Sequence, residues 1–166
     1  MKTALPILLL MPMMAAAVAA QQEGVSDKEN LCIVCHGNSD LWEADTRRLF
    51  VAPDHLAGDI HSQKGIKCQG CHGGNPDTTN LREAHAVEDG FRQIVTPSDI
   101  PGFCGHCHSD VEYMRQFQKE PSVNQVTDFW ASVHGRHLQA NPDAKNAAAC
   151  NACHPKHAIR QAQDPQ

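Results

Sequence analysis

Four copies of one short motif constrain this chain more than any other feature. Each copy has two cysteines separated by two residues and followed directly by a histidine (C-x-x-C-H). The copies are Cys32-Cys35-His36, Cys68-Cys71-His72, Cys104-Cys107-His108 and Cys150-Cys153-His154. They use all eight cysteines of the 166-residue chain. The fold must therefore be arranged around whatever these four motifs hold.

The motif predicts covalent attachment of a c-type haem at each position. Two cysteines at this spacing can reach both vinyl groups of one porphyrin, and the next histidine can bind its iron. Zinc sites and a disulfide framework are alternatives for paired cysteines, but neither requires a histidine after every pair. Histidine makes up 11 of the 166 residues, so chance would place it after all four pairs with a likelihood of roughly 10⁻⁵. The sequence predicts four covalent haem c groups.

The first twenty residues have the pattern of a secretory signal peptide. Lys2 precedes an apolar run and the small-residue stretch AAAVAA, which predicts cleavage between Ala20 and Gln21. We expect residues 21–166 to form one tetrahaem domain in the periplasm or outside the cell. The alternative is a retained membrane anchor, since the apolar stretch is about the minimum length that spans a bilayer.

The composition predicts that the haems form the core. Aromatic residues make up 5% of the chain, and it contains ten prolines, so the polypeptide alone supplies a poor hydrophobic interior. We expect a mainly α fold with extensive irregular structure and little or no β-sheet. Once the signal is removed, Met114 is the only methionine left. At most one haem could then have the His/Met ligation that raises the reduction potential.

Local patterns predict two helices between the third and fourth motifs. Ser109 with Glu112 resembles a capping box and predicts a helix that runs to Lys119. Ser122 with Gln125 repeats the pattern and predicts a second helix with an apolar face. Two histidines of this region are expected on the same face as its tryptophan. After the second motif, the glycine pair of HGG is expected to adopt positive φ.

Seven further histidines are candidates for the opposite side of the haems, where at most four can bind: His55, His61, His85, His106, His134, His137 and His157. His61 lies seven residues before Cys68 and can reach the haem of the second motif or a neighbouring one. His157 follows His154 too closely to bind the same iron without strain, so we expect it on an adjacent haem.

The remaining candidates differ in their surroundings. His85 lies in a polar segment where it has no other evident role, and it is predicted to bind iron. Either His134 or His137 could reach an iron, and we favour His134. His106 lies inside its own motif and is not expected to bind, and His55 and His137 are expected to be exposed or to bond haem propionates. The predicted iron ligands are His36, His72, His108 and His154 in the motifs and His61, His85, His134 and His157 outside them.

On these motifs the chain resembles a periplasmic tetrahaem cytochrome of the multihaem cytochrome c superfamily. The SVHG around His134 and the C-x-x-C-H-x-x-H that ends at His157 resemble distal-ligand motifs of that group. The resemblance implies bis-histidine ligation, closely stacked haem pairs and electron relay between redox partners. The chain differs from the small class III tetrahaem cytochromes of sulfate reducers, which often carry a C-x-x-x-x-C-H variant and adjacent histidines.

The charge of the chain predicts the kind of partner. Its formal charge is −5, and loss of Lys2 with eight ionised propionates would bring it to about −14. Such a carrier should attract redox partners with basic docking faces. Lysines and arginines beside the motifs, including Lys156 and Arg160, are expected to stabilise propionates. Nothing in the sequence indicates nucleic-acid binding. The sequence is also compatible with an oligomer in which the haems of neighbouring subunits stack.

Three functions are compatible with this sequence. The first is an electron-transfer protein that is not an enzyme, in which every iron is six-coordinate. The second is a reductase with one open iron. The third resembles a membrane-anchored tetrahaem quinol dehydrogenase subunit, which requires the N-terminal segment to be retained. We favour electron transfer, because the spare histidines suffice to close every site.

Overall fold

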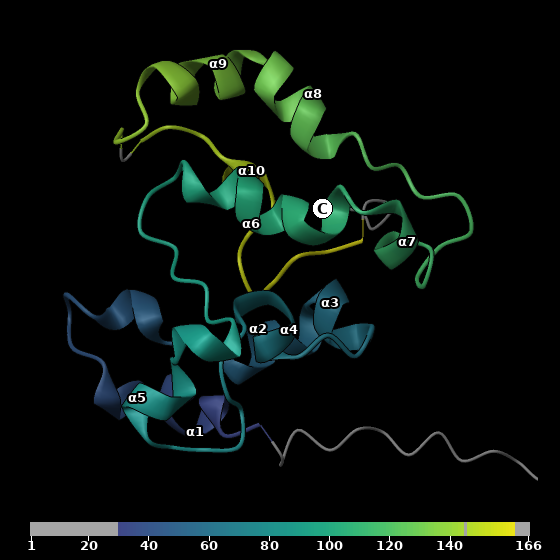
Figure 1. The fold of residues 1–166 in the computed structure, drawn as a ribbon. Helices are drawn as coiled ribbons and strands as arrows, with labels where there is room; N and C mark the ends of the chain where they lie inside the picture. The colour runs from purple at the N-terminus through teal and green to yellow at the C-terminus, as the bar shows by residue number, and fades with distance from the viewer. Residues whose placement is uncertain (1–29, 145, 162–166) are drawn as a thin grey trace, which may run out of the picture.

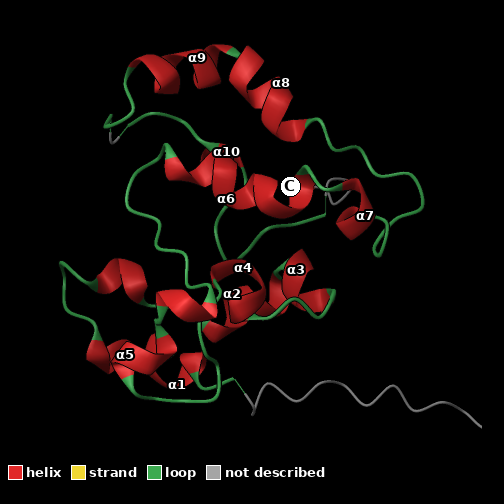
Figure 2. Ribbon diagram, in the orientation of Figure 1, coloured by secondary structure: helices red, strands yellow, loops and turns green. Residues whose placement is uncertain are grey.

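The computed structural model describes residues 30–144 and 146–161, so the expected signal peptide lies outside the described residues. Within these ranges the secondary structure is helical, without strands (Figure 2). The α-helices are α1 (Cys32–His36), α2 (Pro53–Gly58), α3 (Ile60–Gln63), α4 (Cys68–His72), α5 (Leu81–Ala84), α6 (Asp99–His108), α7 (Val111–Met114), α8 (Gln125–Ala131), α9 (Val133–Ala140) and α10 (Cys150–Cys153). The 3-10 helices are η2 (Ser39–Leu41), η3 (Arg47–Leu49) and η4 (Val87–Asp89). The predicted mainly α fold with much irregular structure is confirmed.

The helices lie in successive tiers (Figure 1). One end of the molecule holds α8 and α9, which pack on each other, and α8 also packs on α6. Next to α6 lies α10, brought there from the end of the chain. The tier formed by α2, α3 and α4 follows, and α1 and α5 lie at the far end. No helix among the described residues is long and apolar enough to cross a membrane.

The described polypeptide has a very small core of its own. Its buried hydrophobic residues are Leu138, Ala147 and Ala149. The partly buried residues packed against them are Ile100, Phe129, Trp130 and Ala144. A chain of this size normally buries far more apolar surface. A fold with so small a core fits the expectation that large apolar cofactors complete the interior.

Each C-x-x-C-H motif forms a short helix or the end of one. The first, second and fourth motifs build α1, α4 and α10, and the third forms the last turn of α6. Helical residues three and four positions apart lie on one face. The helix therefore presents both cysteines of a motif on one side, with the histidine at or just beyond its last residue.

Two glycines after α4 fulfil the expected backbone role. Gly73 has φ +67° and Gly74 has φ +79°, in the region that favours glycine. A Cβ atom would lie 2.0 Å from the carbonyl oxygen of Gly90 at the first position and 2.3 Å from that of Ala84 at the second. These glycines let the segment after α5 lie directly against the second motif.

The prediction for the first helix after the third motif was wrong in its cap and its length. Asp110, not Ser109, is the N-cap of α7, and its carboxylate accepts hydrogen bonds from the backbone N–H of Glu112 (2.9 Å) and Tyr113 (3.0 Å). A carboxylate one position closer to the helix displaces the serine as acceptor. The helix ends at Met114, well before Lys119.

The second predicted helix is broken in two. It begins at Gln125 rather than at Ser122, and Ser132 separates α8 from α9. The Ser132 hydroxyl donates to the Phe129 carbonyl (2.6 Å) and accepts from the Gly135 backbone N–H (3.2 Å), so it ends one helix and caps the next. The expectation that His134 and His137 share a continuous helical face with the tryptophan of α8 was therefore wrong.

Candidate haem sites

Three motif histidines lie beside histidines from elsewhere in the chain. The ring centroids of His36 and His85 are 6.0 Å apart, as are those of His61 and His108. The centroids of His72 and His157 are 6.1 Å apart. His61 thus lies beside the third motif rather than the second, and His157 lies beside the second motif rather than its own.

The spacing of these rings suits an iron between each pair. Two metal–nitrogen bonds of about 2 Å, added to the distance from each nitrogen to its ring centre, separate two such rings by roughly 6 Å. The partners in each pair come from different segments, so the tertiary fold creates the pairing. These three pairs are the ligand sets that a bis-histidine haem requires.

Hydrogen bonds fix which ring nitrogen remains available. The Nδ1 atom of His36 lies 2.8 Å from the Leu49 carbonyl oxygen, and that of His85 lies 2.8 Å from the Leu81 carbonyl oxygen. A carbonyl oxygen only accepts, so Nδ1 carries the proton in both rings and Nε2 keeps its lone pair. A ring held in this way is prepared to bind a metal through Nε2.

Burial keeps several of these rings neutral. It is the main reason why the pKa of His72 falls to about 4, and neighbouring histidines contribute. Burial also lowers the pKa of His108 and, together with the charge of Lys156, that of His157. A metal binds the neutral imidazole, so these surroundings favour the ligating form at neutral pH.

The cysteines bring the motifs together in pairs. The thiols of Cys32 and Cys68 share a hydrogen bond, and this hydrogen bond, with burial, raises the pKa of Cys32. The hydrogen bond between Cys104 and Cys150 raises the pKa of Cys104 and lowers that of Cys150 to about 7. The first cysteines of motifs one and two are therefore neighbours, as are those of motifs three and four.

Arg92 lies at the second motif with part of its guanidinium unsatisfied. Its Nη2 donates to the Cys71 carbonyl oxygen (2.5 Å), and its backbone N–H donates to the His72 carbonyl (2.7 Å). The guanidinium carbon lies 5.5 Å from the ring centroid of Phe103. Its Nε is buried and has no hydrogen-bond partner. A buried guanidinium N–H without a partner, beside a haem motif, fits the carboxylate of a haem propionate.

A basic pocket of about 290 Å³ opens beside His157. Its lining residues are Arg47, Arg48, Phe50, Val51, Ala52, His55, Lys156 and His157. Two arginines and a lysine around one cavity attract carboxylates. This supports the expectation that Lys156 stabilises propionates, and it adds two arginines that the sequence had not singled out.

The fourth motif differs from the other three. His154 is exposed, and its ring has no ring contact within the described part of the chain. His134 and His137 lie exposed on α9, where the structure brings neither to a motif histidine among the residues it describes. His55 and His106 are exposed as well. Of the four ligands predicted outside the motifs, His134 alone is not placed beside a motif histidine in the described structure.

Besides the two arginines of the basic pocket, sequence reasoning missed Asp59 and Arg92. Asp59 is a buried carboxylate whose Oδ1 lies 3.1 Å from Nδ1 of His61. Its position two residues before a candidate ligand was a usable signal, because a short acidic side chain there can cap a helix and reach the ring. Arg92 had no comparable signal, since the fold alone brings it to the second motif.

The described residues contain no cluster of side chains suited to the zinc site considered above as an alternative. Within 30–144 and 146–161, no three or more His, Cys, Asp or Glu side chains converge in a way that could hold a metal ion. A structural zinc site takes four such ligands. The donors instead occur as pairs of histidine rings beside C-x-x-C pairs that each lie on a single helix, which is the set that a c-type haem needs.

Short helices that carry C-x-x-C-H, paired histidine rings and a minimal polypeptide core define a multihaem c-type cytochrome. A family model described as cytochrome c3 matches residues 60–164, which include the second, third and fourth motifs. Because the match covers more than half of the chain, the protein belongs to the cytochrome c3 family, although all four of its motifs have the short C-x-x-C-H spacing. No curated protein and no solved structure gives a significant match.

Proposed function

We propose that this protein relays electrons between periplasmic or extracellular redox partners through four covalent haems. Membership of the cytochrome c3 family supports electron transfer through covalently bound haem. The observation that carries the finer proposal is the set of three histidine ring pairs at 6.0 to 6.1 Å. Each bound haem would supply one-electron chemistry at its iron.

The ring pairs support a ligand set for three of the proposed haems. In this proposal His36 with His85 would hold the first, His72 with His157 the second, and His108 with His61 the third. The chain orients these rings through Nδ1 hydrogen bonds and surrounds several of them with low-polarity contacts. Bis-histidine ligation of this kind gives a lower potential than His/Met ligation.

The motif contacts support an order of haems that follows the sequence. Cys32 lies against Cys68, and Cys104 lies against Cys150. Burial and then the charge of Cys107 raise the pKa of Cys71, which places the second motif close to the third. The attachment sites thus form a row from the first motif to the fourth. Such a row suits entry of electrons at one end and exit at the other.

The negative charge of this protein indicates which kind of partner surface it should bind. An acidic protein with propionates should dock on basic faces, and its association rate should fall as salt is added. The basic pocket beside His157 is an exception to the acidic surface and faces propionates in our proposal. Secretion by cleavage after Ala20 remains part of the proposal and is tested by sequencing the N-terminus of the purified protein.

Paramagnetic resonance of the oxidised protein tests the proposed ligation. Six-coordinate irons with two histidines give low-spin ferric signals, and we expect these to account for the three haems with paired rings. A high-spin signal from more than one haem per chain would overturn the ligand assignment.

The fourth motif favours one alternative, a reductase or gas-binding haem. His154 is exposed and has no histidine ring beside it in the described ranges. If this iron is open, the oxidised protein will show one high-spin haem and the reduced protein will bind one equivalent of carbon monoxide. If His134 or His137 closes it, neither will be seen, and His134→Ala or His137→Ala will produce the high-spin signal.

A further inference from the structure

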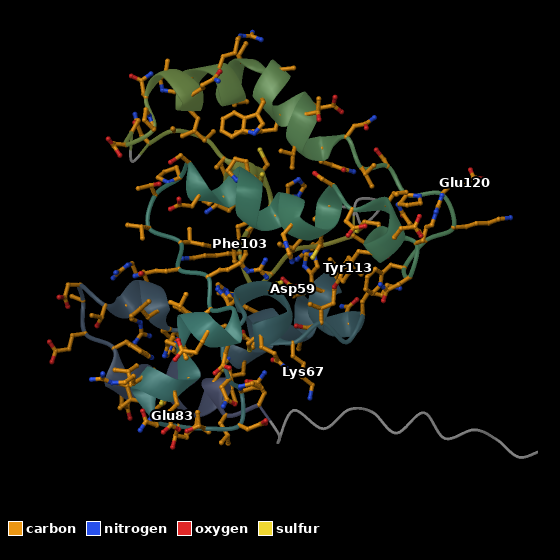
Figure 3. All side chains as sticks on the ribbon, in the orientation of Figure 1. Asp59, Lys67, Glu83, Phe103, Tyr113 and Glu120 are labelled. Atoms are coloured by element: carbon orange, nitrogen blue, oxygen red, sulfur yellow. The ribbon has the colours of Figure 1, made fainter. Side chains whose placement is uncertain are left out.

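Asp59 occupies a central position between the ligands of two haems. It ends α2 and caps α3, near the middle of the molecule in the zone between α6 and the tier of α2 to α4 (Figure 3). The residue is only 5% exposed. A buried carboxylate needs several hydrogen bonds to offset its lost hydration. The donors of the hydrogen bonds to Asp59 therefore identify the segments that this carboxylate holds in place.

One oxygen of this carboxylate holds His61. Oδ1 accepts from the His61 backbone N–H at 2.8 Å and lies 3.1 Å from Nδ1 of the same ring. Because a carboxylate accepts, Nδ1 carries a proton and Nε2 is directed away as a potential metal ligand. The same ring lies 6.0 Å from His108 of the third motif.

The other oxygen holds the end of the chain. Oδ2 accepts from the Ile159 backbone N–H at 2.9 Å, and the adjacent Ile60 N–H donates to the Ile159 carbonyl oxygen at 2.7 Å. These bonds clamp the segment that follows His157, whose φ of +59° is uncommon for a residue with a side chain. The clamp keeps His157 in this conformation, beside His72 of the second motif.

The two oxygens of Asp59 therefore act at two neighbouring haem sites. Oδ1 holds the ring of His61, which lies beside the third motif, and Oδ2 holds the segment that follows His157, which lies beside the second.

We propose that Asp59 is a positioning residue for two haems, orienting His61 toward the third and holding the segment of His157 against the second. This rests on the proposed function, in which these histidines are axial ligands. A carboxylate that accepts from a ligating imidazole raises its basicity, which favours the ferric state. Asp59 therefore lowers the potential of the third haem and couples its ligand to that of the second.

A simple helix-capping role is the rival explanation, and the choice of variant separates the two. Asparagine caps helices about as well as aspartate, so Asp59→Asn retains a cap but removes the charge. Asp59→Ala removes both. Asp54→Asn is the matched control, because Asp54 lies five positions earlier on α2, is exposed, and has no side-chain hydrogen bond or ion pair in the described structure.

The experiment follows the haem methyl resonances of the holoprotein by NMR during stepwise oxidation, with each haem assigned by its contacts. In Asp59→Asn we expect the reduction equilibrium of the third haem to shift about tenfold toward the ferrous state, which is about 59 mV for one electron. The second haem should shift in the same direction by less, and the other two should keep their potentials. Asp54→Asn should leave all four potentials unchanged.

Three results would overturn the proposal. The first is an Asp59→Asn protein with all potentials of the wild type and a loss of thermal stability only in Asp59→Ala, since that is the pattern of a cap. The second is an equal shift of all four haems, which would reflect net charge alone. The third is a wild-type protein without four covalent haems, which removes the proposed function as well. Haem content of every sample is therefore measured first, so the two failures are distinguishable.

Discussion

His61 lies beside His108, with ring centroids 6.0 Å apart, and the two rings are almost perpendicular. The histidine just upstream of the second motif is thus placed at the third. Asp59 and the turn at α3 direct it there. Consecutive haem sites therefore share short stretches of chain, and a change at one ligand can be expected to act on one identifiable haem.

Replacement of His61 by methionine tests this assignment. Because His/Met ligation raises the potential of a haem relative to bis-histidine ligation, we expect the third haem to become the most easily reduced of the four. Potentiometry with NMR assignment identifies the haem that changes. Ser62→Met serves as control, since Ser62 is exposed beside His61 on α3 and should have no effect. A change confined to the second haem would show that His61 serves its own motif.

Replacement of His157 by alanine should open the second haem. His157 lies beside His72 and no other motif ring in the described structure, so its loss leaves one iron five-coordinate. We expect one equivalent of high-spin ferric signal by paramagnetic resonance. His55→Ala is the control, as His55 is exposed and lines the same pocket as His157 but has no ring contact with a motif histidine in the described structure. An unchanged low-spin spectrum in His157→Ala would refute the pairing.

Replacement of Arg92 by methionine should lower the potential of the second haem. The partly unsatisfied guanidinium lies at Cys71 and His72, and a buried cation favours the reduced state with its lower positive charge. We expect a shift of up to about tenfold in the reduction equilibrium, or about 59 mV. Arg115→Met is the control, because Arg115 is exposed and bonds only to Glu112 among side chains. A higher potential in Arg92→Met would contradict this role.

Replacement of Gly74 by alanine should destabilise the fold around the second motif. The position has φ +79°, and a Cβ atom would lie 2.3 Å from the Ala84 carbonyl oxygen. The left-handed backbone alone costs roughly 1–2 kcal/mol for a residue with a side chain, and the steric clash adds to it. Chemical denaturation followed by the haem absorption measures the loss. Gly58→Ala, whose Cβ meets no atom within 4 Å, should lose little, and equal stability of the two variants would refute the close approach.

Stability should fall as the solution becomes acidic. The pKa of His72 is lowered to about 4 by burial, whereas an unfolded histidine titrates near 6.5, so the unfolded state binds more protons between these values. Stability contributed by the neutral ring is complete above about pH 6.5 and is lost toward pH 4. Iron also binds only the neutral ring, so iron binding likewise makes stability fall as the pH decreases. Denaturation midpoints at pH 7 and pH 5 check this, and a higher midpoint at pH 5 would contradict it.

The features that depend on short sequence patterns could be predicted. The glycines after His72 indicate the positive φ that the structure shows, and the C-x-x-C-H spacing predicts where haems attach. The small polypeptide core followed from a composition with few aromatic residues and many prolines. These are local or compositional properties, so one sequence suffices to read them.

The pairing of ligands could not be read in the same way. Which motif lies beside His61 or His85 depends on how segments far apart in sequence pack, and no periodicity encodes that. The break at Ser132 depends on a hydroxyl that serves two helices, and the predicted continuous face through His134 failed for that reason. Asp59 acts through contacts with both the preceding and the final segments, which only the tertiary structure reveals.

The mass of the intact purified holoprotein tests the central claim most directly, namely that four covalent haems form the interior and the working parts of this chain. We expect one species whose mass equals the chain beginning at Gln21 plus four haems, with reduced-minus-oxidised bands of a c-type cytochrome. A mass with fewer than four haems would contradict the claim, and so would a protein that folds with its thiols unmodified.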